Sequence, residues 1–272
     1  MTEGVRSNSN DESSLVKPED GERLGTFIVD WLADQLQASH MGGLVVGLSG
    51  GIDSAVVAGL SRQAVSRTGK HLLAVLMPCH SVPQDEADAR LVADHFGLET
   101  VRVDLAPVYD LLLATFQAAD PHKAYSDDAQ SLAQANLKPR LRMLTLYYLA
   151  NRRQALVVGT GNRSELAVGY FTKYGDGGVD LLPLGSLVKA QVRAVARWLG
   201  VPQPILDKAP SAGLWEGQTD EGEMGLTYAV LDAYLLGRPV DEAAKARIQA
   251  LHARSEHKRR PTPICPLPPE YQ

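Results

Sequence analysis

The sequence predicts an α/β protein with a doubly wound parallel sheet flanked by helices. Short apolar runs typical of buried strands alternate along the chain with segments of helical periodicity. The apolar run at 44–48 also ends in a glycine-rich turn that leads directly into a helix-forming segment. Ligands of such sheets bind beyond the carboxyl ends of the strands. This turn is therefore the first place to expect a functional site.

The order of the elements follows from the same patterns. Strands are expected at 44–48, 72–77, 100–103 and 155–159. Helices are expected at 22–39, 54–67, 84–96, 107–118, 137–153, 189–199, 226–236 and 241–254. We assign Leu111, Leu112 and Leu113 to the core and expect Pro139 to shift the start of the helix at 137–153. From residue 261 the chain is rich in proline and is expected to be irregular.

Length and composition fit a globular protein that is long enough for one large α/β domain or two small ones. The 272 residues contain 44% hydrophobic and 22% charged side chains, as ordinary soluble domains do. We expect a single domain over residues 21–272. A polar tail at 1–20, rich in Ser, Asn, Asp and Glu, is predicted to be disordered. The net charge of −5 argues against a general nucleic-acid binder.

Cysteine usage and hydropathy point to a cytoplasmic location. Cys79 and Cys265 lie far apart and lack the spacing of a metal site, as expected for a reduced protein. No apolar stretch reaches the roughly 18 residues of a membrane span, and no signal-peptide pattern opens the chain. We therefore expect no membrane partner.

The turn after the first strand carries the strongest chemical signal. Glycines allow the backbone to approach a ligand closely, and the following helix presents free N–H groups and a positive dipole to an anion. Hydroxyl groups add donors, and the aspartate provides a carboxylate with which a magnesium ion can bridge protein and phosphate. The segment comprises Gly47, Leu48, Ser49, Gly50, Gly51, Ile52, Asp53 and Ser54.

Two other interpretations of this turn are less favoured. An ordinary strand–helix turn would need the glycines but neither the two serines nor the aspartate. A P-loop would need Gly-Lys where the chain has Ile52-Asp53. The missing lysine argues against a kinase or GTPase.

A second glycine-containing segment follows the strand at 155–159. Gly159 and Gly161 suggest a dinucleotide-binding fingerprint, and Asp180 lies about 20 residues further on, but Ser164 occupies the place of the third glycine. A better interpretation assigns Thr160 and Glu165 to an ATP–magnesium site. The alternative for Glu165 is an acidic residue that complements a helix N-terminus.

The loop at 172–180 is the third candidate. Its glycines permit tight backbone geometry, Lys173 can neutralise a phosphate, and Asp176 and Asp180 can accept hydrogen bonds from sugar or amide groups. Taken alone, the same composition also fits a solvated glycine loop.

Together these motifs resemble a known family. Residues 49–54 resemble the SGGxDS pyrophosphate loop of the ATP pyrophosphatases, and the whole combination is similar to bacterial ammonia-dependent NAD synthetases. The matching segments are 47–54, 77–81, 138–143, 159–165, 170–180, 181–184 with Lys189, 208–220 and 256–258. The resemblance implies an adenine nucleotide alpha hydrolase-like, Rossmann-like fold.

The resemblance also implies a reaction. The family adenylates the nicotinate carboxylate of deamido-NAD with ATP, and ammonia then displaces AMP to give NAD. A carboxylate by itself reacts poorly with an amine because oxide is a very poor leaving group, and adenylation replaces it with a stabilised phosphate. The implied partners are ATP, deamido-NAD and ammonia, with Mg²⁺ as cofactor and a homodimer as the assembly.

Site residues carry over by their match to the family's motifs. Residues 47–54, Thr160, Lys189 and Ser211 would contact ATP, and Asp53 and Glu165 would hold magnesium. Arg140, Lys173, Asp180, His257 and Lys258 would contact deamido-NAD. Ser211 stands where threonine is common in the family, but a hydroxyl is retained. Asp176 is our candidate for accepting a proton from ammonium or orienting ammonia.

Simpler roles also fit several of these residues. Individually, Arg140, Lys189, His257 and Lys258 are compatible with solvent-exposed helix charges. Other enzymes with the same loop, such as GMP synthetase-like, argininosuccinate synthetase-like or tRNA-thiolating proteins, are the main rivals. A non-catalytic nucleotide-binding module is a further rival, although it need not keep Asp53 and Glu165 together with the loop at 172–180.

Overall fold

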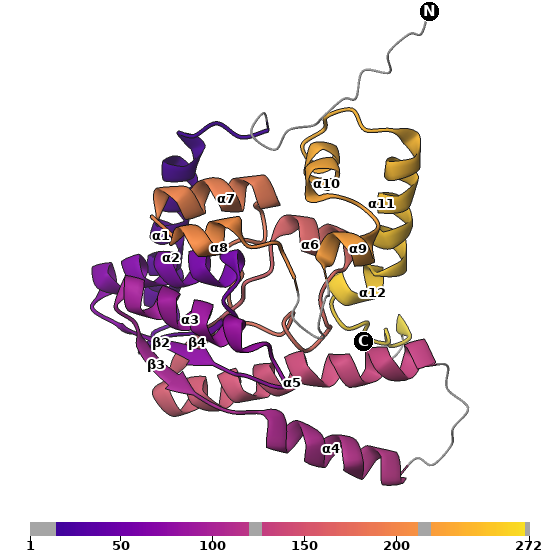
Figure 1. Cartoon of the computed structure of the whole chain (residues 1–272), viewed down its shortest axis with the longest axis horizontal. Helices are drawn as coiled ribbons and strands as arrows, with labels where there is room; N and C mark the ends of the chain where they lie inside the picture. Colours follow the sequence, from indigo (N-terminus) through magenta and orange to yellow (C-terminus); the bar gives the residue numbers. More distant parts are fainter. Residues whose placement is uncertain (1–14, 120–126, 212–218, 270–272) are drawn as a thin grey trace, which may run out of the picture.

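A four-stranded parallel sheet forms the centre of the computed structural model, which describes residues 15–119, 127–211 and 219–269 (Figure 1). The strands are β1 (Gly43–Leu48), β2 (His71–Leu76), β3 (Glu99–Arg102) and β4 (Ala155–Val158), in the spatial order β3-β2-β1-β4. The chain thus proceeds from β1 in one direction to β3 and returns to the other side of β1 with β4. This reversal places the topological switch point beyond the carboxyl ends of β1 and β4.

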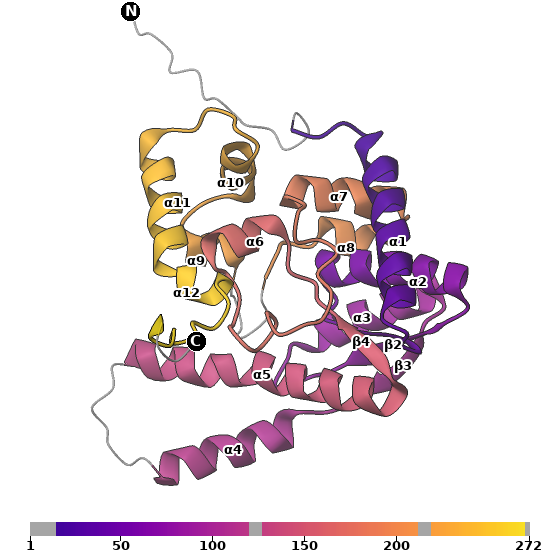
Figure 2. The same cartoon turned by 180° about the vertical axis from the view of Figure 1, so that it is seen from behind.

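Helices cover both faces of the sheet because its strands are apolar on both sides. Val46 on β1 packs into one core cluster, while its neighbour Val45 packs into a second cluster on the opposite face. The first face is covered by α1 (Asp20–Ala38), α2 (Ile52–Thr68), α3 (Pro83–Phe96), α7 (Lys189–Trp198) and α8 (Gln203–Asp207). The second is covered by α4 (Ala106–Ala119) and α5 (Asp127–Arg153), which lie side by side in both views (Figures 1 and 2).

A smaller helical unit stands beyond the sheet on the side of α6 (Arg163–Val168). It comprises α9 (Asp220–Met224), α10 (Tyr228–Leu235), α11 (Glu242–Arg254) and α12 (Glu256–Arg259) (Figure 2). Its separate core contains Val168, Met224, Tyr228, Leu231, Ile248 and Leu251. Because α6 contributes to this core and follows β4 directly, the unit is joined to the switch point of the sheet.

The fold class and the four strands agree with the sequence-based expectation, and most helix ends lie within two residues of the expected positions. The helix expected at 137–153 is different, because it begins at Asp127 and holds Pro139 in its interior. The expectation that Pro139 shifts the start of this helix is therefore wrong. The disordered tail is predicted for residues 1–20. Residues 1–14 of this range lie outside the described residues, and α1 begins at its last residue, Asp20.

The leucines of α4 correct a second expectation. Leu111 is 69% exposed and does not belong to the core, whereas Leu112 and Leu113 pack against it as partly buried side chains. Short helices α6, α8, α9 and α12 were not expected, because each spans six residues or fewer. Such lengths do not develop a helical hydrophobic period. Across the described ranges, no helix has the length and apolar character needed to cross a membrane.

Candidate functional site

The glycine turn between β1 and α2 is organised by its two serines. The Ser49 and Ser54 hydroxyls lie 3.1 Å apart, and Ser54 Oγ accepts from the Ser49 amide at 3.2 Å. Ser54 Oγ also donates to the Gly51 carbonyl at 2.9 Å. Gly51 is the N-cap of α2 and has no side chain with which to cap the helix. The turn therefore presents the N-terminus of α2 without a capping group, as an anion-binding turn requires.

Gly50 fits the turn against α3. Its φ of +78° lies in the left-handed region that favours glycine. A Cβ atom at this position would lie 2.5 Å from the Asp85 carbonyl oxygen and 2.9 Å from Asp88 Cβ. Lys208 links the same two acidic residues, with Nζ at 2.8 Å from Asp85 and 2.6 Å from Asp88. The turn is thus held between the sheet and the first turn of α3.

Three charged side chains from three helices meet beside this turn. Lys189 Nζ, at the start of α7, lies 2.5 Å from Asp53 Oδ2 on α2 and 3.7 Å from Glu165 Oε1 on α6. The Lys189 side chain is only 1% exposed. The interpretation of Lys189 as a solvent-exposed helix charge is therefore wrong. Asp53 and Glu165, the two residues that the sequence analysis assigns to magnesium, thus lie against the same ammonium group.

Asn162 connects Asp53 to Glu165. Its side-chain amide donates to Asp53 Oδ1 at 3.0 Å, and its side-chain carbonyl oxygen accepts from the Glu165 backbone amide at 3.0 Å. Glu165 returns a bond, because its Oε2 accepts from the Asn162 backbone amide at 3.0 Å. Sequence reasoning missed Asn162, although Asn-x-x-Glu is the signature of a capping box. This box fixes the first turn of α6 and with it the direction of Glu165.

The charged groups of this centre shift the pKa values of Glu165 and Lys189. Burial, together with the neighbouring carboxylate of Asp53, raises the pKa of Glu165 to about 8 against the opposing effect of Lys189. Burial alone would lower the pKa of Lys189, but the carboxylates of Asp53 and Glu165 outweigh it, and the net shift is upward. Lys189 is thus a cation, and the raised pKa of Glu165 means that the centre favours one further positive charge, which a proton supplies at neutral pH.

The donor set fits a magnesium ion that shares its ligands with phosphate. Magnesium sites on nucleotides use one or two protein carboxylates together with phosphate oxygens and water. Asp53 and Glu165 keep 19% and 16% of their side-chain surface exposed, and Asp53 lies in the first turn of α2, directly after the capless N-terminus. Within the described residues no cluster of three or more His, Cys, Asp or Glu encloses a metal by itself. The residues therefore suit a metal bound with its nucleotide rather than a closed protein site.

The loop at 172–180 and α12 form a second group of predicted residues. Lys173 Nζ donates to the His257 carbonyl oxygen at 2.7 Å, and Lys258 Nζ donates to the carbonyl oxygens of Gly169 and Phe171 at 2.8 and 2.7 Å. Arg140 on α5 lies 3.5 Å from the Lys173 carbonyl oxygen. The carboxylate of Asp176 accepts from the Thr172 amide at 2.9 Å. These contacts gather the basic side chains of Arg140, Lys173 and Lys258, which together with His257 we call the basic rim. Both lysines already use part of their hydrogen-bonding capacity on backbone carbonyl oxygens.

The other predicted residues are Asp180, Thr160 and Ser211. Asp180 is tied to the sheet, since it accepts from the Val157 amide at 2.8 Å and from the Tyr147 hydroxyl at 3.0 Å. Thr160 is half-buried directly beyond β4. Ser211 is exposed at the end of the described range 127–211. Asp180, which the sequence analysis assigns to the substrate, thus also has a structural role.

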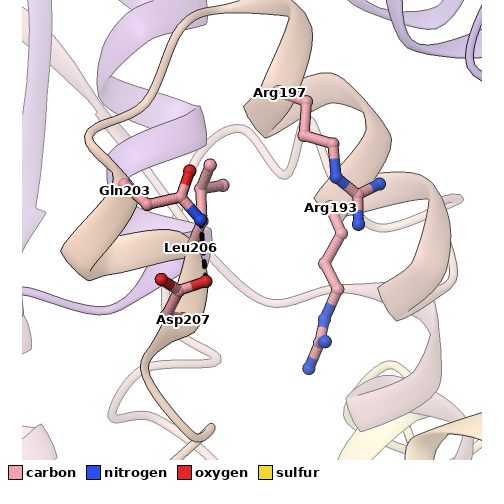
Figure 3. A pocket seen from close by; sticks show the side chains of 5 residues that line it. All are labelled: Arg193, Arg197, Gln203, Leu206 and Asp207. Atoms are coloured by element: carbon pink, nitrogen blue, oxygen red, sulfur yellow. Dashed lines mark hydrogen bonds between the residues drawn. The ribbon is translucent and has the colours of Figure 1, made fainter.

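A cavity elsewhere contains none of these residues. It has a volume of about 410 Å³ and is lined by Arg193 and Arg197 of α7 together with Gln203, Leu206 and Asp207 of α8 (Figure 3). In this region Gln203 donates to Asp207 at 2.8 Å. The charged centre at Lys189 occupies the opposite end of α7. We therefore base the functional assignment on the turn after β1 and its neighbours.

Comparison with known proteins agrees with this geometry. The family model described as NAD synthase matches residues 25–262. The NH(3)-dependent NAD(+) synthetase of Carboxydothermus hydrogenoformans is 50% identical over 233 residues, which cover 86% of this chain and 93% of that protein.

Two solved structures are similar over nearly the whole chain. The NMN synthetase from Francisella tularensis is 39% identical with a TM-score of 0.83, covering 93% of this chain and 100% of that one. The NAD+ synthetase from Burkholderia pseudomallei is 35% identical with a TM-score of 0.75, covering 91% of this chain and 94% of that one. The chain belongs to the NAD synthase family.

Proposed function

We propose that this chain catalyses the ATP-dependent amidation of deamido-NAD with ammonia, the final step of NAD biosynthesis, and releases AMP and pyrophosphate. Family membership and the activity named for the 50%-identical relative support this assignment. The observation that carries it is the meeting of Asp53, Glu165 and Lys189 beside a glycine turn with an uncapped helix N-terminus. This arrangement suits the binding of a pyrophosphate group and a divalent cation.

In the first step, an oxygen of the nicotinate carboxylate attacks the α-phosphorus of ATP and the bond to the β-phosphate oxygen breaks. Pyrophosphate leaves with the bonding electron pair, and a mixed anhydride with AMP remains. The amides of the turn and the Lys189 ammonium are positioned to stabilise the negative charge that moves onto the leaving pyrophosphate. Magnesium, held by Asp53 and Glu165, would supply further neutralisation of the phosphates.

In the second step, the ammonia nitrogen attacks the carbonyl carbon and AMP leaves with the oxygen that joined it to the acyl group. The nitrogen loses a proton as the amide forms. Asp176 is the proposed acceptor or orienting group, and it lies on the loop that also carries Lys173. The proposed rim for deamido-NAD consists of Arg140, Lys173, His257 and Lys258. In this proposal Thr160 and Ser211 provide hydroxyl groups for ATP. Asp180 supports the loop.

A direct assay tests the proposal. Purified protein is mixed with ATP, Mg²⁺, ammonium and deamido-NAD, and the products are identified by chromatography. We expect NAD, AMP and pyrophosphate in equal amounts. Exchange of labelled pyrophosphate into ATP, dependent on deamido-NAD but independent of ammonium, would support the adenylated intermediate. Formation of ADP instead of AMP contradicts the assignment.

A second candidate substrate comes from the structural comparison. The solved structure with a TM-score of 0.83 is named an NMN synthetase, so a mononucleotide acid that would yield NMN should be tested in the same assay. The same site chemistry serves both acids, because each presents a nicotinate carboxylate. The ratio of the two kcat/KM values decides between them, and we expect deamido-NAD to be preferred.

Asp176→Asn is expected to lower kcat at saturating ammonium and to change its dependence on pH. General acid–base groups typically raise the reaction rate about 100- to 10,000-fold. If Asp176 only orients ammonia, we expect kcat to fall by an amount near the lower end of this range. Asp30→Asn is the matched control. Asp30 is an exposed residue of α1 that pairs with Arg67 of α2, away from the loop at 172–180. Unchanged turnover and an unchanged pH profile for Asp176→Asn would refute the proposed role.

The outer surface of α4 and α5 supports a homodimer. Several large apolar side chains on these adjacent helices are 46–69% exposed: Val108, Leu111, Phe116, Leu132, Leu144 and Tyr148. Exposed apolar patches of this kind mark protein interfaces. We expect Leu144→Glu to convert a dimer into a monomer in light scattering coupled to gel filtration. Leu91→Glu on α3 is the control and should leave the mass unchanged, whereas a monomeric unmodified protein would exclude the dimer.

We also propose that residues 21–272 form a single domain that acts in the cytoplasm. The family match over 25–262 supports the first point. The free thiols of Cys79 and Cys265 suit a reducing compartment. Limited proteolysis and cell fractionation test these two points separately.

A further inference from the structure

The N-terminus of α7, which carries Lys189, is capped from another helix. Its N-cap residue is Val188, whose side chain has no oxygen to accept from the first amides. The carboxylate of Asp232, on α10, takes this place and accepts from the Ala190 amide at 2.7 Å. Asp232 is fully buried. A buried negative charge at this position is stabilised by the positive end of the α7 dipole.

The same carboxylate also holds α6. Ser164 Oγ donates to Asp232 Oδ1 at 2.6 Å and accepts from the Lys189 amide at 3.2 Å. Ser164 is fully buried and directly precedes Glu165. One carboxylate thus connects the backbone of Lys189 with the helix turn that carries Glu165.

A second contact from α10 reaches the far end of the lysine. Tyr228 lies one turn before Asp232, so both side chains project from the same side of the helix. The Lys189 ammonium lies 4.9 Å from the centre of the Tyr228 ring, and the ring is fully buried. The Tyr228 hydroxyl is fixed by a bond to Asp220 at 2.9 Å. α10 therefore contacts Lys189 at its backbone and at its charged end.

We propose that Asp232, acting through Ser164 and the N-terminus of α7, is a positioning residue that sets Lys189 and Glu165 against Asp53 for the adenylation step. This inference rests on the nucleotide site proposed above. No atom of Asp232 needs to touch a substrate for this role. Its effect is expected on the rate of the phosphate chemistry and not on the capture of deamido-NAD, whose proposed rim lies on α5, α12 and the loop at 172–180.

Asp232→Asn is the main test, because asparagine keeps the shape and one acceptor oxygen but removes the charge. We expect kcat to fall at least tenfold, with the KM for deamido-NAD changing less than twofold. Hydrogen exchange of the Lys189 and Ala190 amides should become faster. Ser164→Ala should change the same parameters in the same direction, and the double variant should be little worse than Asp232→Asn because both act at one point.

The matched control is Asp241→Asn. Asp241 caps α11 by accepting from the Ala244 amide at 2.7 Å, so Asp241→Asn removes the same charge from a helix N-terminus that lies away from Lys189 and keeps an acceptor oxygen for the cap. We expect Asp241→Asn to lower the melting temperature while kcat stays within twofold of the unmodified protein. Equal kinetics for Asp232→Asn and Asp241→Asn, or a loss of kcat that only follows the folded fraction, would overturn the inference.

Two further results keep this test separate from the proposed function. If the unmodified protein forms no NAD, the proposed function fails irrespective of Asp232. If Asp232→Asn does not fold, Ser164→Ala carries the test, and an unchanged kcat for that variant overturns the inference.

Discussion

Replacing Lys189 with methionine is expected to lower kcat by about 100- to 1000-fold, the usual effect of removing one preorganised donor from a site of charge development. Methionine keeps the apolar stem of the side chain but has no charge to balance the leaving pyrophosphate. Steady-state assays at saturating ATP and Mg²⁺ measure this loss. A fall of less than threefold would remove Lys189 from the proposed chemistry.

The same substitution should destabilise the protein in a way that depends on pH. Breaking a buried ion pair costs about 3–5 kcal/mol, and the lower end applies here because Asp53 and Glu165 retain some exposure. Because the folded state holds the pKa of Glu165 at about 8, above its ordinary value, ionising Glu165 weakens folding as pH rises through that range. Without Lys189 this weakening becomes larger. Denaturant titrations at pH 6 and pH 8.5 should therefore show the greater loss at pH 8.5.

Lys245→Met provides the control for both measurements. Lys245 is an exposed residue of α11 whose partner, Glu242, lies at 3.5 Å on the same helix. Surface pairs of this kind contribute at most about 1 kcal/mol. We expect neither kcat nor the pH dependence of stability to change in this variant.

Gly50→Ala is expected to reduce kcat/KM for ATP by about 100-fold, as small displacements of a catalytic group can. The left-handed backbone costs an alanine about 1–2 kcal/mol, and the overlap with the Asp85 carbonyl oxygen adds about 1–3 kcal/mol of overpacking. The turn can relieve the overlap only by moving away from α3. Binding of ATP measured by calorimetry and unfolding in urea test the two effects separately.

Gly69→Ala separates the backbone cost from the overlap. Gly69 has a φ of +67° at the end of α2, and a Cβ atom there would meet nothing within 4 Å. We expect this variant to lose only the backbone part of the stability and to bind ATP normally. If Gly50→Ala behaved in the same way, contact with α3 would not position the turn.

Local sequence pattern identified the first strand and the turn after it. The strand at 44–48 and the glycines after it predicted a turn suited to an anion at the carboxyl end of a strand, because period, composition and turn chemistry are local properties. Asp53 and Glu165 were identified from the segments that follow two predicted strands, and Lys189 from its resemblance to a family motif; the structure places the three together. Their convergence depends on the order of the strands, which composition does not reveal.

Sequence reasoning missed Asn162 although its capping box is a local pattern, and it missed Asp232 because the role of that residue exists only between distant elements. Asp232 looks like an ordinary aspartate in an apolar helix, and nothing near it in the sequence indicates that it caps α7. Leu111 was placed in the core because leucine runs usually are buried, but its face of α4 is exposed. Pro139 suggested a helix boundary, whereas the interior of α5 accommodates it.

The span of the Asp53–Lys189 contact has a consequence for synthesis. These partners are separated by 136 positions, and the bond from Ser164 to Asp232 spans another 68. At about 5–20 residues per second, translation from Asp53 to Lys189 takes roughly 7–27 s. During that interval the nascent chain already contains the glycine turn but lacks the lysine that balances Asp53 and Glu165, so the charged centre can form only late in synthesis.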